Sequence, residues 1–176
     1  MYNWRITKYN PSNRDASGRY NVKDWTSFYD IGKEFNGEKV TVYDYLQVEE
    51  AYIRSILAFI DAHNINYMTV KELERPEESL QINRHTSLYT NDMINMYKTL
   101  KEDDTLNTTE IEVLSRLILR EHIWCKLQHG KTLFVHFGYD YYLYMGSPVK
   151  NEHVLDMIKQ QGLFVEEFNS PYNDEI

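Results

Sequence analysis

Residues 122–147 constrain the fold most, because two apolar runs flank a short turn signal. His129-Gly130-Lys131 can form a three-residue hairpin loop, and side chains alternate between the two faces of each strand. With that loop, six apolar side chains share one face in the opposing pairs Leu127/Leu133, Cys125/Val135 and Ile123/Phe137. A register that buries all six is favoured, so the sequence predicts an antiparallel hairpin with one buried face.

The opposite face of this hairpin is aromatic and polar. The same register places Trp124 across from His136 and Lys126 across from Phe134. A third strand over residues 141–145 adds Tyr142 and Tyr144 to one face, and Leu143 and Met145 to the other. The register of this third strand stays open, and so does the question of whether a helix covers the aromatic face.

Helical spacing and capping residues predict about four helices elsewhere in the chain. Thr41 caps a helix that runs to His63-Asn64, and further helices are expected near residues 93–100, 107–121 and 151–161. Strands are expected at residues 2–9, 66–73 and 163–168. The prediction is one α+β domain over residues 1–176. A meandering antiparallel sheet forms its C-terminal half, with helices on the Cys125/Val135/Phe137 face.

The composition excludes several function classes. Apolar residues make up 42% of the chain, which is typical of a packed protein rather than a disordered one. The 27 acidic and 19 basic residues leave a net charge of −8, and such a field repels phosphate. We therefore expect a basic protein partner, without nucleic-acid or membrane binding. The single cysteine and the absence of a signal-peptide pattern predict a cytoplasmic protein.

The residue types that carry catalysis form no recognisable motif. His122, His129 and His136 recur every seven residues, but on the expected hairpin they do not converge on one metal ion. Cys125 and His136 point to opposite faces, which argues against a nucleophile with its base. Adjacent carboxylates such as Glu49-Glu50 are interpreted as solvated charge, and the glycines form no phosphate-binding loop.

We therefore expect no metal, no cofactor and no catalytic residue. Two alternatives stay open. One is a small hydrolase that uses His122 or His136 with a carboxylate, and the other is an interaction module with a different kind of partner.

Acidic clusters and aromatic side chains are the candidate binding residues. Acids gather at residues 72–78, at 102–104 and in the C-terminal segment 166–175. Carboxylates that face a basic groove speed association, and aromatic side chains supply the contacts that hold a complex together. The candidates are Asp103, Asp104, Glu166 and Glu167 for steering, and Trp124, Phe134, His136, Tyr142 and Tyr144 for contact.

Several segments resemble small bacterial proteins associated with the immunity proteins of polymorphic toxin systems. They are residues 4–11 (WRITKYNP), 25–32 (WTSFYDIG), 123–127 (IWCKL), 134–142 (FVHFGYDYY), 162–168 (GLFVEEF) and 170–172 (SPY). The resemblance implies an intracellular, non-catalytic inhibitor that occludes the active site of a cognate toxin. It assigns no individual binding residue.

Overall fold

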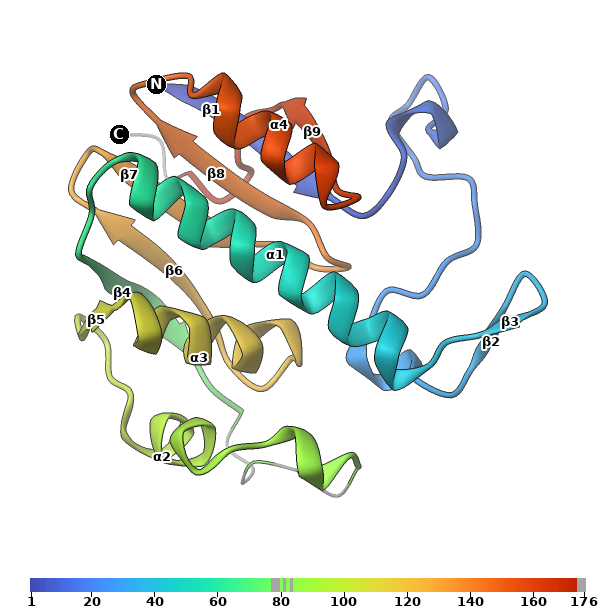
Figure 1. Cartoon of the computed structure of the whole chain (residues 1–176), viewed down its shortest axis with the longest axis horizontal. Coiled ribbons are helices and arrows are strands. Elements are labelled where there is room, and N and C mark those ends of the chain that lie inside the picture. The colour runs from blue at the N-terminus through green and yellow to red at the C-terminus, as the bar shows by residue number, and fades with distance from the viewer. Residues whose placement is uncertain (77–79, 81, 83, 174–176) are drawn as a thin grey trace.

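The computed structural model describes residues 1–76, 80, 82 and 84–173. Within these residues the chain forms a seven-stranded sheet with the order β5-β4-β6-β7-β8-β1-β9, in which every neighbouring pair is antiparallel (Figure 1). Its strands are β1 (Tyr2–Thr7), β4 (Tyr67–Glu74), β5 (Thr105–Asn107), β6 (Trp124–His129), β7 (Leu133–Phe137), β8 (Leu143–Ser147) and β9 (Phe164–Glu167). A separate small hairpin joins β2 (Glu34–Phe35) to β3 (Glu38–Lys39).

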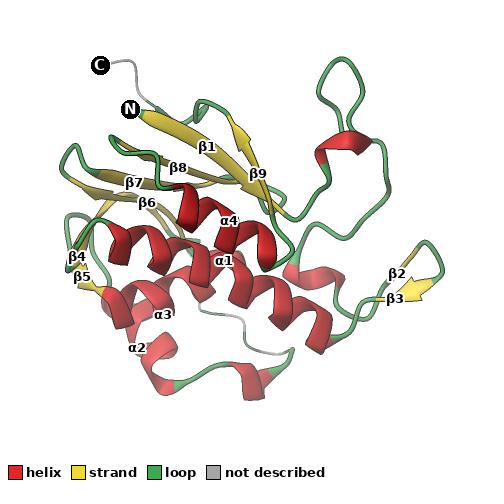
Figure 2. Ribbon diagram, turned by 45° about the horizontal axis from the view of Figure 1, so that its top comes forward, coloured by secondary structure: helices red, strands yellow, loops and turns green. Residues whose placement is uncertain are grey.

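The α-helices lie on one side of the sheet, as Figure 2 shows. They are α1 (Val42–Ala62), α2 (Asn91–Thr99), α3 (Thr108–Leu119) and α4 (Glu152–Gln160), and short 3₁₀ turns occur at Pro11–Asn13, Phe28–Asp30 and Thr86–Leu88. The predicted α1 cap is present, because Thr41 and Asp44 exchange side-chain to backbone hydrogen bonds. No helix in the described residues has both the length and the apolar character needed to cross a bilayer.

The predicted α+β class is confirmed. The expected buried face of the sheet meets the helices, since Cys125, Val135 and Phe137 are all buried. On the same face, the Trp4 ring of β1 packs 5.3 Å from the Phe59 ring of α1. The core therefore lies between one helical layer and one sheet layer.

The hairpin register differs from the predicted one by two residues. Leu127 pairs with Val135, and Lys126 rather than Trp124 lies across from His136. The loop is residues 130–132, and the Thr132 N–H bonds to the His129 carbonyl at 3.0 Å. Gly130 begins this loop with φ +51°, a conformation that glycine adopts without steric cost. A shift of two residues leaves each side chain on its original face, so apolar alternation cannot distinguish the two registers.

The C-terminal segment, residues 168–173, covers part of the aromatic face of the sheet. The Ser170 hydroxyl lies 2.8 Å from Nδ1 of His136 on β7. The Tyr172 ring lies 5.7 Å from the Trp124 ring and 5.9 Å from the Tyr144 ring. An irregular segment of the chain itself, rather than a helix, therefore shields much of this face.

Glu49 corrects the interpretation of the Glu49-Glu50 pair as solvated charge. Its side chain is fully buried and accepts hydrogen bonds from Arg120 Nε at 2.6 Å and Arg120 Nη2 at 2.8 Å. Arg116 and the Tyr45 hydroxyl donate two more bonds at 2.9 and 3.0 Å. Glu49 lies on α1, and its arginine partners lie on α3 and at its C-cap, so this buried network fixes the two helices together.

Candidate functional site

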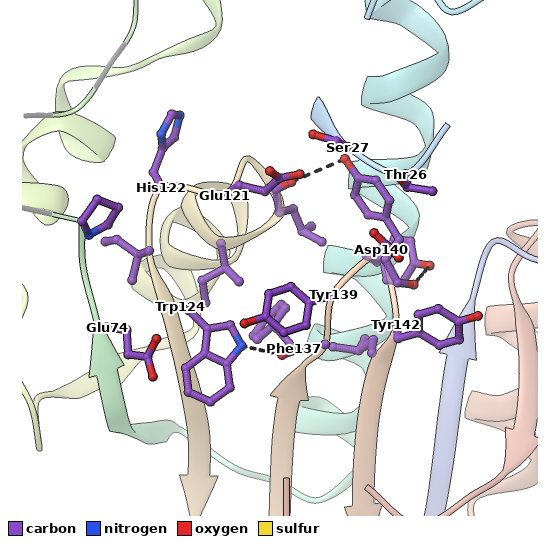
Figure 3. Close-up of a pocket in the computed structure, with 18 of the residues that line it drawn as sticks. Thr26, Ser27, Glu74, Glu121, His122, Trp124, Phe137, Tyr139, Asp140 and Tyr142 are labelled. Carbon is purple, nitrogen blue, oxygen red and sulfur yellow. Dashed lines mark hydrogen bonds between the residues drawn. The ribbon is translucent and has the colours of Figure 1, made fainter. Parts of the chain in front are cut away.

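A cavity of about 570 Å³ lies at the end of the sheet where β4 and β7 end and where β6 and β8 begin (Figure 3). Its walls come from five regions of the sequence. These are α1 at Tyr52, the end of β4, the α3–β6 connection, the β7–β8 turn and the segment of residues 26–27. Such a convergence of loops on a rigid frame is the usual setting of a binding site.

Three carboxylates line this cavity, and no cation in the described part of the chain pairs with them. Glu74, Glu121 and Asp140 are all exposed, and none forms an ion pair with a described Lys, Arg or His residue. Although Glu121 is exposed on one side, partial desolvation by the cavity wall raises its pKa. The nearby charges of Asp30 and Asp140 raise the pKa further, whereas hydrogen bonds from the Ser27 side chain and the Phe28 backbone lower it. The cavity is therefore short of positive charge.

Glu121 also has a left-handed backbone conformation, which residues other than glycine rarely adopt. It follows the C-cap of α3 with φ +64°, and its N–H bonds to the Ile118 carbonyl while the His122 N–H bonds to the Leu117 carbonyl. This is the Schellman arrangement, in which glycine is favoured at the position of Glu121. A negative charge there also opposes the helix dipole. Helix termination alone therefore does not explain a glutamate at this position.

Aromatic rings form the rest of the cavity wall. The Trp124 indole N–H donates to the Phe137 carbonyl at 2.6 Å, which fixes the ring plane. Tyr139 stands over the cavity with 79% of its surface exposed, and Tyr142 lies beyond it (Figure 3). The Arg14 guanidinium donates to the Tyr142 hydroxyl at 2.8 Å and holds that ring. Trp124 and Tyr142 are therefore held in place, and Tyr139 is open to water.

A tight turn places Tyr139 and Asp140 at the mouth of the cavity. Asp140 and Tyr141 have φ +56° and +60°, and the Tyr142 N–H bonds to the Tyr139 carbonyl at 3.2 Å. Positive φ at both central residues is the type I′ arrangement, which ordinarily selects Asn-Gly. Tyr141 is buried, and its ring lies 5.4 Å from that of Trp25. Core packing of Tyr141 thus holds the turn that presents its neighbours.

The predicted contact residues fall into two groups. Trp124 and Tyr142 line the cavity. The other three lie on the sheet face, where His136 contacts Ser170 and Tyr144 packs against Phe168 and Tyr172. Phe134 is half-buried, and its ring stacks on His136 at 4.4 Å. The aromatic cluster expected from strand alternation is therefore divided between the cavity and the covered face.

The predicted steering acids lie at opposite edges of the sheet. Asp103 and Asp104 precede the edge strand β5, and Asp103 is 67% exposed and pairs with Lys71. The Asp104 carboxylate accepts a hydrogen bond from the Lys101 N–H. On the other edge strand, β9, Glu167 is 78% exposed, whereas Glu166 forms a bidentate pair with Arg5 at 2.9 and 3.0 Å. Further acids named from the sequence, at 77–78 and 174–175, lie outside the described residues.

Sequence analysis did not single out Glu121, Asp140, Glu74 or Tyr139 as a group. The usable signal was a glutamate at the C-terminal end of a predicted helix, where glycine is favoured. The other three meet it only because distant loops converge at the end of the sheet.

His122 also borders the cavity, but its ring is engaged elsewhere. Its Nε2 lies 2.7 Å from the Tyr89 hydroxyl, and in Figure 3 the ring points away from Trp124 and Tyr139. Burial, followed by the charge of Arg120, lowers the pKa of His122 to about 4. The imidazole is therefore neutral at pH 7, and its described hydrogen bond goes to a phenol rather than a carboxylate.

Acidification from pH 6.5 to pH 4 is expected to destabilise the fold through His122. In this window the unfolded chain binds a proton that the folded chain excludes. The free energy of unfolding therefore decreases as the pH is lowered. The expected loss is about 2–3 kcal/mol by pH 4. Urea unfolding at a series of pH values measures it. His122→Gln should reduce the slope of the free energy of unfolding against pH. His153→Gln, at an exposed site, should leave that slope unchanged. Equal slopes in both variants would contradict the assignment.

Comparisons with known proteins return no relative. The chain matches no protein-family model, and it matches neither a curated protein nor a solved structure. In the described part of the chain, no three His, Cys, Asp or Glu side chains are grouped so as to hold a metal ion. The cavity and its residues are therefore the features of the molecule that indicate a function.

Proposed function

We propose that this protein is a non-catalytic, cytoplasmic immunity protein that binds a basic toxin domain and occludes its active site. The observation that carries the proposal is the cavity whose three carboxylates pair with no cation among the described residues and whose walls are partly aromatic. Carboxylates attract a basic partner, and fixed aromatic rings supply desolvated contacts. The resemblance of residues 4–11, 25–32 and 134–142 to immunity proteins points to the same class of partner.

The hydrolase alternative receives less support from the geometry. Of the two candidate bases, His122 contacts the Tyr89 phenol at 2.7 Å. His136 has a serine hydroxyl, that of Ser170, 2.8 Å from its Nδ1. Both residues are buried, and the Ser170 oxygen also accepts from the Tyr172 N–H at 3.2 Å. This pair anchors the C-terminal segment and is closed to a substrate.

The test is co-expression with the protein encoded by the adjacent gene, followed by kinetics of the purified complex. We expect the chain to suppress the toxicity of that protein's C-terminal domain and to co-purify with it. If toxicity persists although the chain is expressed and folded, the proposed function is wrong.

Charge should control the rate at which this complex forms. Asp103→Lys with Glu167→Lys is expected to slow association about tenfold at low salt, with a smaller change in dissociation. These two acids are chosen because they are exposed and their pairs with Lys71 and Lys150 lie at the surface, whereas reversal of Glu166 would break a partly buried bidentate pair with Arg5. Stopped-flow kinetics across a salt series measures the effect. The control is Glu152→Lys with Asp156→Lys on α4, which changes the net charge by the same amount. An association rate that is flat in salt would exclude steering.

A further inference from the structure

The geometry points to an arginine side chain as the ligand of the cavity: we propose that one arginine of the partner inserts its guanidinium among Glu121, Asp140, Trp124 and Tyr139. This inference rests on the proposed function, since it names the group that the partner presents. It predicts a single anchoring residue at a defined place rather than a diffuse acidic surface.

The charge of the cavity favours a cationic ligand. Glu121 and Asp140 come from different loops, and no described cation pairs with either of them, although Glu121 accepts hydrogen bonds from Ser27 and the Phe28 backbone. The uncompensated charges favour a positively charged ligand over a neutral or negative one. A guanidinium has five N–H donors in a flat fork, so it can bond to carboxylates that approach it from two directions.

The aromatic wall of the cavity favours a flat cation. Trp124 is fixed by its bond to Phe137, and Tyr139 offers an exposed ring above the same space (Figure 3). Cations bind over the faces of Trp and Tyr, and arginine does so more often than lysine because its plane also stacks. The chain already uses this contact elsewhere, since the Arg5 guanidinium lies 4.1 Å from the centre of the Phe168 ring.

Arg75 also lines the cavity near Glu74, but its guanidinium is turned away from the proposed arginine site. Its Nη2 donates to the Leu100 carbonyl at 2.7 Å, and its guanidinium lies over the Tyr97 ring. This arginine is therefore turned toward α2 and does not neutralise Glu121 or Asp140. A volume of about 570 Å³ exceeds what one side chain needs, so water can accompany the inserted group.

The experiment uses the whole chain without a partner, and N-acetyl-arginine methylamide as the probe. Its guanidinium is its only charge. Binding is followed by NMR through the indole N–H signal of Trp124, with that of the buried Trp4 on β1 as an internal reference. We expect saturable binding with a dissociation constant on the order of 1 mM. N-acetyl-citrulline methylamide, which has the same shape without the charge, should bind about tenfold more weakly.

Variants locate the site. Glu121→Gln with Asp140→Asn keeps the side-chain shapes and should weaken arginine binding at least about tenfold. The matched control is Glu152→Gln with Asp156→Asn on the exposed surface of α4, which should leave binding unchanged. Equal binding of the citrulline probe, or an equal loss in the control, would overturn the cavity assignment. Equal binding of N-acetyl-lysine methylamide would overturn the choice of arginine.

These outcomes are distinct from a failure of the proposed function. A chain that protects against the toxin but ignores the arginine probe retains the function and refutes the cavity ligand. A chain that binds the probe but neither protects nor forms a complex retains the cavity ligand and refutes the immunity function.

Discussion

Replacement of Arg120 by Ala is expected to lower the free energy of unfolding by about 3–5 kcal/mol, because it leaves the Glu49 carboxylate buried without its principal partner. Arg120 is also almost fully buried, and it donates to the Leu88 carbonyl at 2.7 Å, so the variant loses a contact to the segment before α2. Chemical denaturation monitored by circular dichroism measures the change.

Two comparisons isolate the buried charge in this prediction. Arg54→Ala removes the exposed Arg54–Glu50 pair on the same helix, α1, and should change stability by less than about 1 kcal/mol. Glu49→Leu with Arg120→Met removes both charges and should recover much of the loss, since apolar packing can replace a buried ion pair. If Arg120→Ala and Arg54→Ala have the same effect, the network is not the structural element described above.

Cys125→Asp is expected to destabilise the protein by about 3 kcal/mol or more, because it places a carboxylate against the helical layer with no partner. Cys125 is fully buried, and burial raises the pKa of its thiol to about 12, with a smaller contribution from the charge of Glu102. Urea denaturation measures the loss. The control on the same strand is Gln128→Asp, at an exposed position, which should cost less than about 1 kcal/mol.

A melting temperature of Cys125→Asp within a degree or two of the unmodified protein would mean that the helices do not cover this face of the sheet. The variant does not report the hairpin register, because Cys125 lies on the buried face in the predicted and in the observed pairing alike.

The covered aromatic face changes which residues are expected to hold a partner. Strand alternation suggests a single cluster, but Phe168, Ser170 and Tyr172 occupy the space over Tyr144 and His136. Trp124 and Tyr142 line the cavity, and Tyr172 also packs against the Trp124 ring. Of the predicted anchors, Trp124 is therefore the one whose loss should hasten dissociation most, since it forms a wall of the proposed arginine site.

Local patterns in the sequence determined the class of the fold. Thr41 and Asp44 predict the start of α1 because their capping bonds span only three residues, and Asn107 with Glu110 does the same for α3. Alternation of apolar residues assigned Cys125, Val135 and Phe137 to the buried face. These features depend on neighbours along the chain, which is why they can be read from the sequence without coordinates.

Tertiary structure alone decided the features that depend on distant residues or on backbone angles. The hairpin register depended on the conformation of Gly130 and Thr132, to which apolar alternation is insensitive. Glu49 became a buried ion because α3 places Arg116 and Arg120 against it. The cavity arose because the end of α3, the β7–β8 turn and the end of β4 meet at one end of the sheet. A residue's own sequence context fixes its secondary structure, but the partner of a charge is fixed by packing between segments far apart in the chain.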